Sequence, residues 1–196
     1  ETMPRTVDNI GFYSRLGFVP SHLTITMTAE AAGGAGAGYT ALGTLEPAQR
    51  ERRLAEVRAL VAELAPGVDF AREIQLTHEL RLGDVLVVGP PGAVTGFALC
   101  HSAPLAENGA RDETRVLKVA ARSLDALLAV LDAAEAWAAR EGARRIGVRC
   151  QTGYGEAFRA LVRRGFRVRW TDLRMTLAGH PETPPAAGVV WSNWEV

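Results

Sequence analysis

Apolar side chains recur on one helical face in the stretch that follows a glycine-rich segment. Residues 54–64 keep this spacing, and a Pro-Gly pair ends the run. Asp69 can cap a second run, residues 70–80, whose apolar side chains also share one side. The pattern therefore predicts two consecutive helices, the second of which ends at Gly83.

From residue 84 the pattern changes to that of strands. Residues 84–89 are rich in β-branched side chains, residues 90–92 read Pro-Pro-Gly, and residues 93–102 are again apolar. This succession predicts a β-hairpin. A polar loop is expected at residues 104–112, and a further strand at residues 114–121.

The next elements alternate between helix and strand. Ser123 can cap a long helix with apolar residues on its inner face, and Gly142 closes it. A strand at residues 145–151, a short helix at 156–164 and a long strand at 166–177 follow. The order predicts an α/β (α+β) fold, in which helices cover a mostly antiparallel sheet splayed around one parallel pair of strands.

The parallel pair is expected to be formed by residues 114–121 and 145–151. A long helix joins these two strands, and such crossovers are right-handed and connect parallel neighbours.

The N-terminal part reads as a separate piece. Residues 1–28 have a strand, helix, strand pattern, and residues 29–43 have the Gly/Ala composition of a linker. Residues 44–179 form the main domain, and residues 180–196 a tail. The apolar side chains of the first piece cannot be buried by that piece alone, so it must dock.

The docking element of this first piece is a strand. Residues 22–28 alternate between apolar and polar side chains and should add to a free edge of the main sheet, within the chain or across a homodimer. In the tail, Trp191 and Trp194 either contribute to an exposed apolar patch or close a monomer core.

Composition excludes several classes of protein. The 196 residues carry 22 basic and 22 acidic side chains, and 47% are hydrophobic. Such a chain folds, and zero net charge argues against nucleic acid or a membrane surface as a partner. No apolar run is long enough to span a membrane, and residues 1–4 lack a secretory pattern, so the cytoplasm is expected. Cys100 and Cys150 are expected to be buried free thiols, and no metal site is expected.

The main domain resembles the GNAT superfamily of acyl-CoA-dependent N-acyltransferases. Three segments match the order and spacing of that family: Ala133, Glu135, Trp137, Ala138 and Gly142; then residues 145–148; then Leu161 and residues 165–168. The resemblance covers about two thirds of the chain. It implies the GNAT fold, acetyl-CoA as cosubstrate, and transfer of an acetyl group to an amine on a small molecule or peptide.

A second resemblance lies at the N-terminus. Residues 2–18 resemble the closing strand and helix of a GNAT domain, and residues 12–18 are similar to residues 160–166. The chain is therefore similar to the C-terminal part of a tandem GNAT protein, with the tail of a first domain and a degenerate second one. The alternative is two unrelated amphipathic helices, each ending at a Gly-Phe pair.

In this family, backbone N–H groups at the start of the long helix hold the pyrophosphate of acetyl-CoA. The resemblance places that contact at Val119, Ala121, Arg122 and Ser123. The segment lacks the glycine-rich loop of typical members, and Asp125 in the first turn would repel phosphate. An ordinary N-terminal cap at Ser123 is the competing interpretation. We therefore expect the groove where the two parallel strands diverge to be empty or to hold something other than a well-seated coenzyme A.

Many members use a Tyr on the last short helix to reprotonate the departing thiolate. Aligning the two Gly-Phe pairs places Tyr13 opposite Leu161 and Asn9 opposite Ala157. The resemblance thus assigns the catalytic Tyr13 and Asn9 to the N-terminal fragment, and the complete domain lacks both.

Proton removal from the amine needs a carboxylate or an imidazole, and Glu113, His101 and Asp172 lie at strand positions without a motif. Two functions remain. The chain is an N-acetyltransferase of unknown acceptor, weak when alone, or it is a non-catalytic scaffold or dimerisation module that supports a missing catalytic domain.

Overall fold

The computed structural model describes residues 1–31, 33, 38–104 and 112–192. The predicted polar loop and part of the predicted linker lie outside these residues. The helices are α1 (Val7–Arg15), α2 (Pro47–Leu64), α3 (Ala71–Glu79), α4 (Leu124–Arg140) and α5 (Gly155–Arg163), with a 3-10 turn, η1, at Leu42–Thr44. The strands are β1 (Phe18–Glu30), β2 (Tyr39–Ala41), β3 (Gly83–Val88), β4 (Gly96–His101), β5 (Glu113–Ala121), β6 (Arg145–Gln151), β7 (Arg167–Leu177) and β8 (Val189–Ser192).

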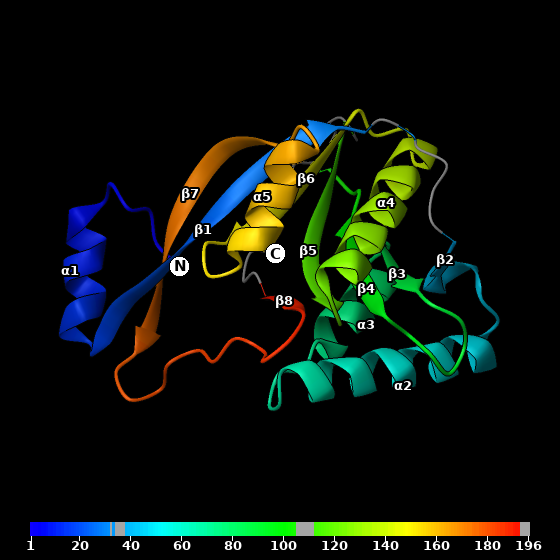
Figure 1. Ribbon diagram of the computed structural model, residues 1–196, viewed down its shortest axis with the longest axis horizontal. Helices are drawn as coiled ribbons and strands as arrows, with labels where there is room; N and C mark the ends of the chain where they lie inside the picture. Colours follow the sequence, from blue (N-terminus) through cyan, green and yellow to red (C-terminus); the bar gives the residue numbers. More distant parts are fainter. Residues whose placement is uncertain (32, 34–37, 105–111, 193–196) are drawn as a thin grey trace.

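The eight strands form one mixed sheet in the order β2-β3-β4-β5-β6-β1-β7, with β8 paired to β5 (Figure 1). The β5–β6 pair is parallel and all other pairs are antiparallel. The predicted fold class and the predicted parallel pair are therefore confirmed.

Helices cover both faces of the half of the sheet that contains β3, β4 and β5. Leu86 and Val88 of β3 belong to a core with α4 and α5, whereas Val85 and Val87 belong to a second core with α2 and α3. Successive side chains of a strand point to opposite faces, so the two cores lie on the two sides of the sheet. Both thiols, Cys100 and Cys150, are free and buried, as expected.

The N-terminal strand docks within the chain, but its predicted place was wrong. β1 does not add to a free edge; it lies inside the sheet, antiparallel to β6 on one side and to β7 on the other. The alternating pattern of residues 22–28 reports a strand with one buried face, and it contains no information on whether the strand has one neighbour or two.

Trp191 closes a monomer core, which was one of two predicted roles. Its side chain is fully buried in the core that contains α4, whereas Trp194 lies outside the described residues. Across the described part of the chain, no helix is both long and apolar enough to span a bilayer.

Candidate functional site

The two parallel strands separate after four residue pairs. β5 and β6 pair from Glu113–Arg145 to Val116–Val148, and the last four residues of β5 pair instead with β8. The chain's own C-terminal strand therefore occupies the place where β5 and β6 diverge. Whether coenzyme A can still bind there stays a prediction.

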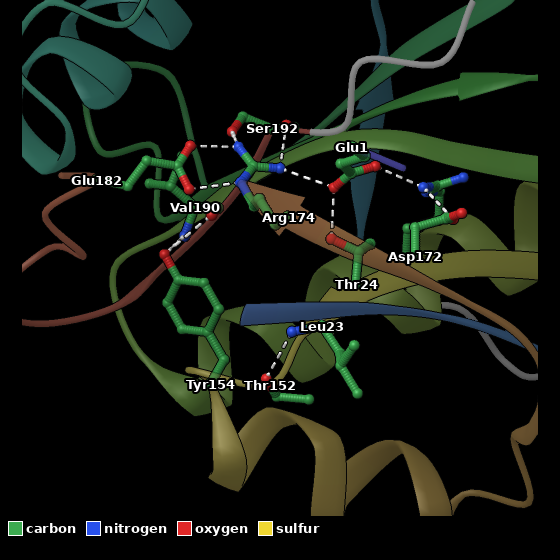
Figure 2. Close-up of polar contacts among 11 residues, drawn as sticks. Glu1, Leu23, Thr24, Thr152, Tyr154, Asp172, Arg174, Glu182, Val190 and Ser192 are labelled. Atoms are coloured by element: carbon green, nitrogen blue, oxygen red, sulfur yellow. Dashed lines mark hydrogen bonds and ion pairs between the residues drawn. The ribbon is translucent and has the colours of Figure 1, made fainter. Parts of the chain in front are cut away.

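The Tyr154 hydroxyl satisfies both main-chain groups of Val190 on the outer edge of β8. The Tyr154 hydroxyl donates to the Val190 carbonyl oxygen at 2.9 Å and accepts from the Val190 N–H at 3.3 Å (Figure 2). In an antiparallel pair, the N–H and C=O of one residue point to the same side, so these groups of Val190 face away from β5. The Tyr154 hydroxyl thus makes the two hydrogen bonds to Val190 that a further strand would make. Burial raises the pKa of its phenol, and the hydroxyl remains protonated at neutral pH.

Arg174 of β7 holds the end of β8. Its guanidinium donates to the Ser192 carbonyl oxygen at 3.2 Å and to the Ser192 Oγ at 3.1 Å. The same guanidinium pairs with Glu182, in the segment between β7 and β8, and with Glu1 at 2.9 Å. Arg174 is nearly fully buried. It therefore connects β8, which fills the groove, to the group of charged side chains described next.

We define the charged cluster as Glu1, Arg149, Asp172, Arg174 and Glu182. Arg149 of β6 contacts the Glu1 carboxylate at 2.6 Å and the Asp172 carboxylate at 2.8 Å. Asp172 also accepts from the Trp170 indole N–H at 3.1 Å. These ion pairs lie on the sheet face opposite α4, because Arg149 alternates with the core residues Val148 and Cys150.

The cluster fixes the ionisation of Glu1. Burial alone would raise the pKa of this carboxyl, but a hydrogen bond from Thr24 and the charges of Arg149 and Arg174 outweigh burial and hold the pKa below its usual value. Lys118 of β5 is buried beside the cluster, and its Nζ lies 3.5 Å from Glu73 Oε1. Burial lowers the pKa of Lys118, which Glu73 partly offsets.

The residues expected to hold acetyl-CoA all have protein partners. Val119 and Ala121 are fully buried and pair with β8. Ser123 Oγ accepts from the Ala126 N–H at 3.1 Å, which makes it a helix cap. Arg122 donates to the Val94 carbonyl oxygen at 3.1 Å and pairs with Glu63. In this arrangement β8 takes the strand edge at Val119 and Ala121, and a role of the four residues in holding acetyl-CoA stays a prediction.

Tyr13 and Asn9 lie far from these residues. Both are exposed on α1, which contacts only the β1–β7 end of the sheet, whereas α4 lies at the other end of the molecule (Figure 1). The structure therefore does not bring the predicted catalytic pair together with Val119, Ala121, Arg122 and Ser123. Their roles stay predictions.

The other polar candidates are held in pairs. His101 Nε2 lies 2.7 Å from the Thr77 hydroxyl, and burial with the nearby Arg115 lowers its pKa to about 4. Glu113 pairs with Arg145 at 3.6 Å, and only Asp172 belongs to the charged cluster. Sequence reasoning missed Arg149 and Arg174, although both alternate with apolar residues on strands, a signal that marks one polar face.

A separate hollow of about 520 Å³ lies between α2, α3 and β3. Asp84 lines it, and its carboxylate accepts from the Gly43 N–H at 2.8 Å and from its neighbour Val85 at 2.7 Å. Burial raises the pKa of Asp84. In the described part of the chain, no group of three or more His, Cys, Asp or Glu side chains could hold a metal ion.

Comparison with known proteins identifies solved structures of the same fold. An acetyltransferase candidate from Pyrococcus horikoshii is 15% identical with a TM-score of 0.65, and the match covers 97% of this chain and 56% of that one. A GCN5-related N-acetyltransferase from Sphaerobacter thermophilus is 18% identical with a TM-score of 0.57, covering 95% and 61%. A conserved protein of unknown function from Staphylococcus epidermidis is 12% identical with a TM-score of 0.54, covering 89% and 67%.

This chain thus spans less than two thirds of the length of the first two structures. No protein-family model and no curated protein matches its sequence. The splayed parallel pair, the helices on both faces and these structural matches together show that the chain has the fold of the GNAT N-acetyltransferases.

Proposed function

We propose that this chain is a GNAT-type module that supports an acetyl-CoA-dependent N-acetyltransferase without carrying out the transfer itself. The observation that carries the proposal is β8, which pairs with β5 inside the splay and buries Trp191 there. A cosubstrate in this groove would need the same strand edge and the same space, so β8 and acetyl-CoA exclude one another.

The proton chemistry supports the same conclusion. Acetyl transfer leaves a thiolate that must be reprotonated, and a phenol at hydrogen-bond distance is a suitable acid. Tyr154 is the phenol nearest to β8, but its proton is donated to the Val190 carbonyl oxygen. Leu161, at the position where the family resemblance expects the acid, has no proton to give.

The competing function is N-acetyl transfer by this chain, by direct attack of an amine on acetyl-CoA in a ternary complex. The GNAT fold favours it. It requires β8 to leave the groove, which breaks its pairing with β5, the contacts of Tyr154 and Arg174, and the packing of Trp191.

We further propose that the supporting role is that of one half of a two-unit GNAT protein. The repeated helix-Gly-Phe-strand segment supports this, as does the greater length of the matched structures. On this proposal the amine substrate and the acetyl-CoA are bound by the other unit.

Binding of acetyl-CoA to the whole chain tests the proposal. We expect no saturable heat in isothermal titration with acetyl-CoA up to 1 mM, roughly a hundred times a micromolar-range dissociation constant, and no rise in melting temperature. A ligand at a hundred times its Kd would add about 2.7 kcal/mol of stability. Coenzyme A without the acetyl group serves as the matched ligand control.

Two outcomes separate the functions. Saturable micromolar binding together with acetyl-CoA-dependent thiol release in the presence of amines would overturn the proposal in favour of the acetyltransferase. If acetyl-CoA binds to the Tyr154→Phe variant but not to the unchanged chain, β8 alone closes the groove. Tyr39→Phe is the control, because the Tyr39 hydroxyl makes no hydrogen bond to the described residues.

A further inference from the structure

The helix-strand unit at the N-terminus has a second copy near the C-terminus. α1 and α5 are each nine residues long, and each is followed by a glycine with positive φ, 87° at Gly17 and 86° at Gly165. Phe18, the first residue of β1, and Phe166, the residue before β7, come next. A shift of 148 positions, from Gly17 to Gly165, relates the two units.

The pairing of β1 with β7 obeys a local two-fold symmetry under this shift. Adding 148 to a β1 position and subtracting 148 from its β7 partner gives the equivalent pair. The pair Thr24–Asp172 is its own equivalent. The pair Ile25–Thr171 is equivalent to Leu23–Leu173, and both pairs are present. Likewise, Thr28–Arg167 and its equivalent Val19–Thr176 are both present. The two units are therefore equivalent in space as well as in sequence.

The outer neighbours of the two strands complete the comparison. On β1, Ile25 pairs with Cys150 of β6. The same shift turns this pair into Leu173–Thr2, and Thr2 forms an isolated bridge with Leu173 on the outer edge of β7. Thr2 thus stands where the end of a strand like β6 would lie. Among the described residues, it is the only partner on that edge of β7.

The two helices differ in what covers them. α5 buries Ala157, Ala160 and Leu161 and contacts α4 and β6. Their equivalents on α1 are Asn9, Phe12 and Tyr13, and α1 has no buried residue. The Phe12 side chain is 51% exposed, although its equivalent Ala160 is 4% exposed.

We propose that the outer edge of β7 and the exposed face of α1 dock a second GNAT-type unit. This unit supplies a strand antiparallel to β7 at the positions beyond Leu173, where the register set by Thr2 continues, and a helix against α1, as α4 lies against α5. The proposal rests on the two-unit architecture proposed above. Because Phe12 and Tyr13 are larger than Ala160 and Leu161, the docking helix must present smaller side chains than α4 does.

A second copy of this chain is excluded as the occupant by its own packing. In any copy, β6 already holds β1 and α4 already holds α5. Neither can serve α1 and β7 of a neighbour without giving up those contacts. The occupant is therefore a GNAT-type sheet that lacks a closing helix-strand unit of its own.

Hydrogen exchange of the native assembly tests the docking site. The protein is recovered under native conditions from cells that make it, with an antibody against the exposed segment 180–187. Its exchange is then compared with that of the chain alone. We expect the amides of α1 to exchange at least a hundred-fold more slowly in the assembly, and those of α5 to be unchanged. Equal rates in α1 would overturn the proposal, as would a chain that is already dimeric alone with α1 protected.

Two matched variants add a second readout. Phe12→Asp should reduce the yield of assembly at least ten-fold while the melting temperature of the chain alone stays within 1 °C, because Phe12 is exposed there. Val162→Asp changes a side chain on α5 that is 50% exposed and should leave both unchanged. The docking site would be contradicted if the Phe12→Asp variant still assembles. It would also be contradicted if the partner that protects α1 has no GNAT-type strand and helix. Titration with acetyl-CoA tests the proposed function separately, since it does not involve α1.

Discussion

Replacing Tyr154 with Phe removes the hydroxyl that completes the outer edge of β8. The ring stays, so packing is preserved, but the Val190 N–H and C=O both lose their partner. Val190 is 8% exposed. A buried main-chain group left without a hydrogen bond costs about 1–3 kcal/mol. Because one water molecule can replace part of the loss, we expect Tyr154→Phe to lower the free energy of unfolding by about 2 kcal/mol.

Two measurements follow this change. Urea unfolding reports the global loss, and hydrogen exchange at residues 189–192 reports local opening of β8. A loss of about 2 kcal/mol corresponds to a roughly 30-fold larger open population. The amides of β8 should therefore exchange roughly 30-fold faster if opening is local.

Tyr39→Phe is the matched control and should change the free energy of unfolding by less than about 0.5 kcal/mol, as expected for a tyrosine without a hydrogen-bonded hydroxyl. If Tyr154→Phe behaves like this control and residues 189–192 exchange at the original rate, Tyr154 does not hold β8 and the reasoning on the closed groove fails.

Four further substitutions give the remaining predictions. Arg174→Met removes one of the two cations that pair with the buried Glu1 and takes the partner from Glu182 and from the Ser192 carbonyl oxygen, and it should cost about 3–5 kcal/mol in thermal unfolding; a loss under 1 kcal/mol would show that the cluster does not need this cation. Gly188→Ala should cost about 2 kcal/mol or more in urea, since φ is +82° and the new Cβ would lie 2.3 Å from a β5 carbonyl oxygen. Gly179→Ala, with φ of +83° and open space, should cost about half as much. His101 has its pKa lowered to about 4, so its stabilising contribution is complete above pH 6.5 and falls as pH drops toward 4, by about 3 kcal/mol; His101→Gln should flatten that part of the stability curve, and an unchanged slope would contradict the assignment.

Local patterns predicted most elements, because each depends on residues close in sequence. The long helix is an example: apolar spacing gave its inner face, and Ser123 caps it through Ala126 as expected. The central place of β1 could not be predicted in this way. Its alternation requires one buried face, but the identity of its neighbours depends on contacts with strands from the other end of the chain.

The site was only partly predictable. The glycine-free segment before the long helix predicted a groove unsuited to coenzyme A, and the structure adds that β8 pairs with β5 in this groove. The strand that fills the groove has four residues, Val-Val-Trp-Ser, and so short an apolar run fits a strand or a buried tail equally well. The charged cluster needs two strands, β6 and β7, the segment that follows β7, and Glu1 to meet, and no local spacing contains that information.

The central place of β1 also decides when the sheet can be completed. Leu23 and Thr152, which meet by a hydrogen bond beside β1, are separated by 129 positions along the chain. The entropy of closing so long a loop is lost before its contacts form, which slows folding. At a synthesis rate of about 5–20 residues per second, β1 emerges roughly 6 to 25 seconds before β6. During that interval both edges of β1 are open, so newly made chains should depend on a holding chaperone at this strand more than at any hairpin in the domain.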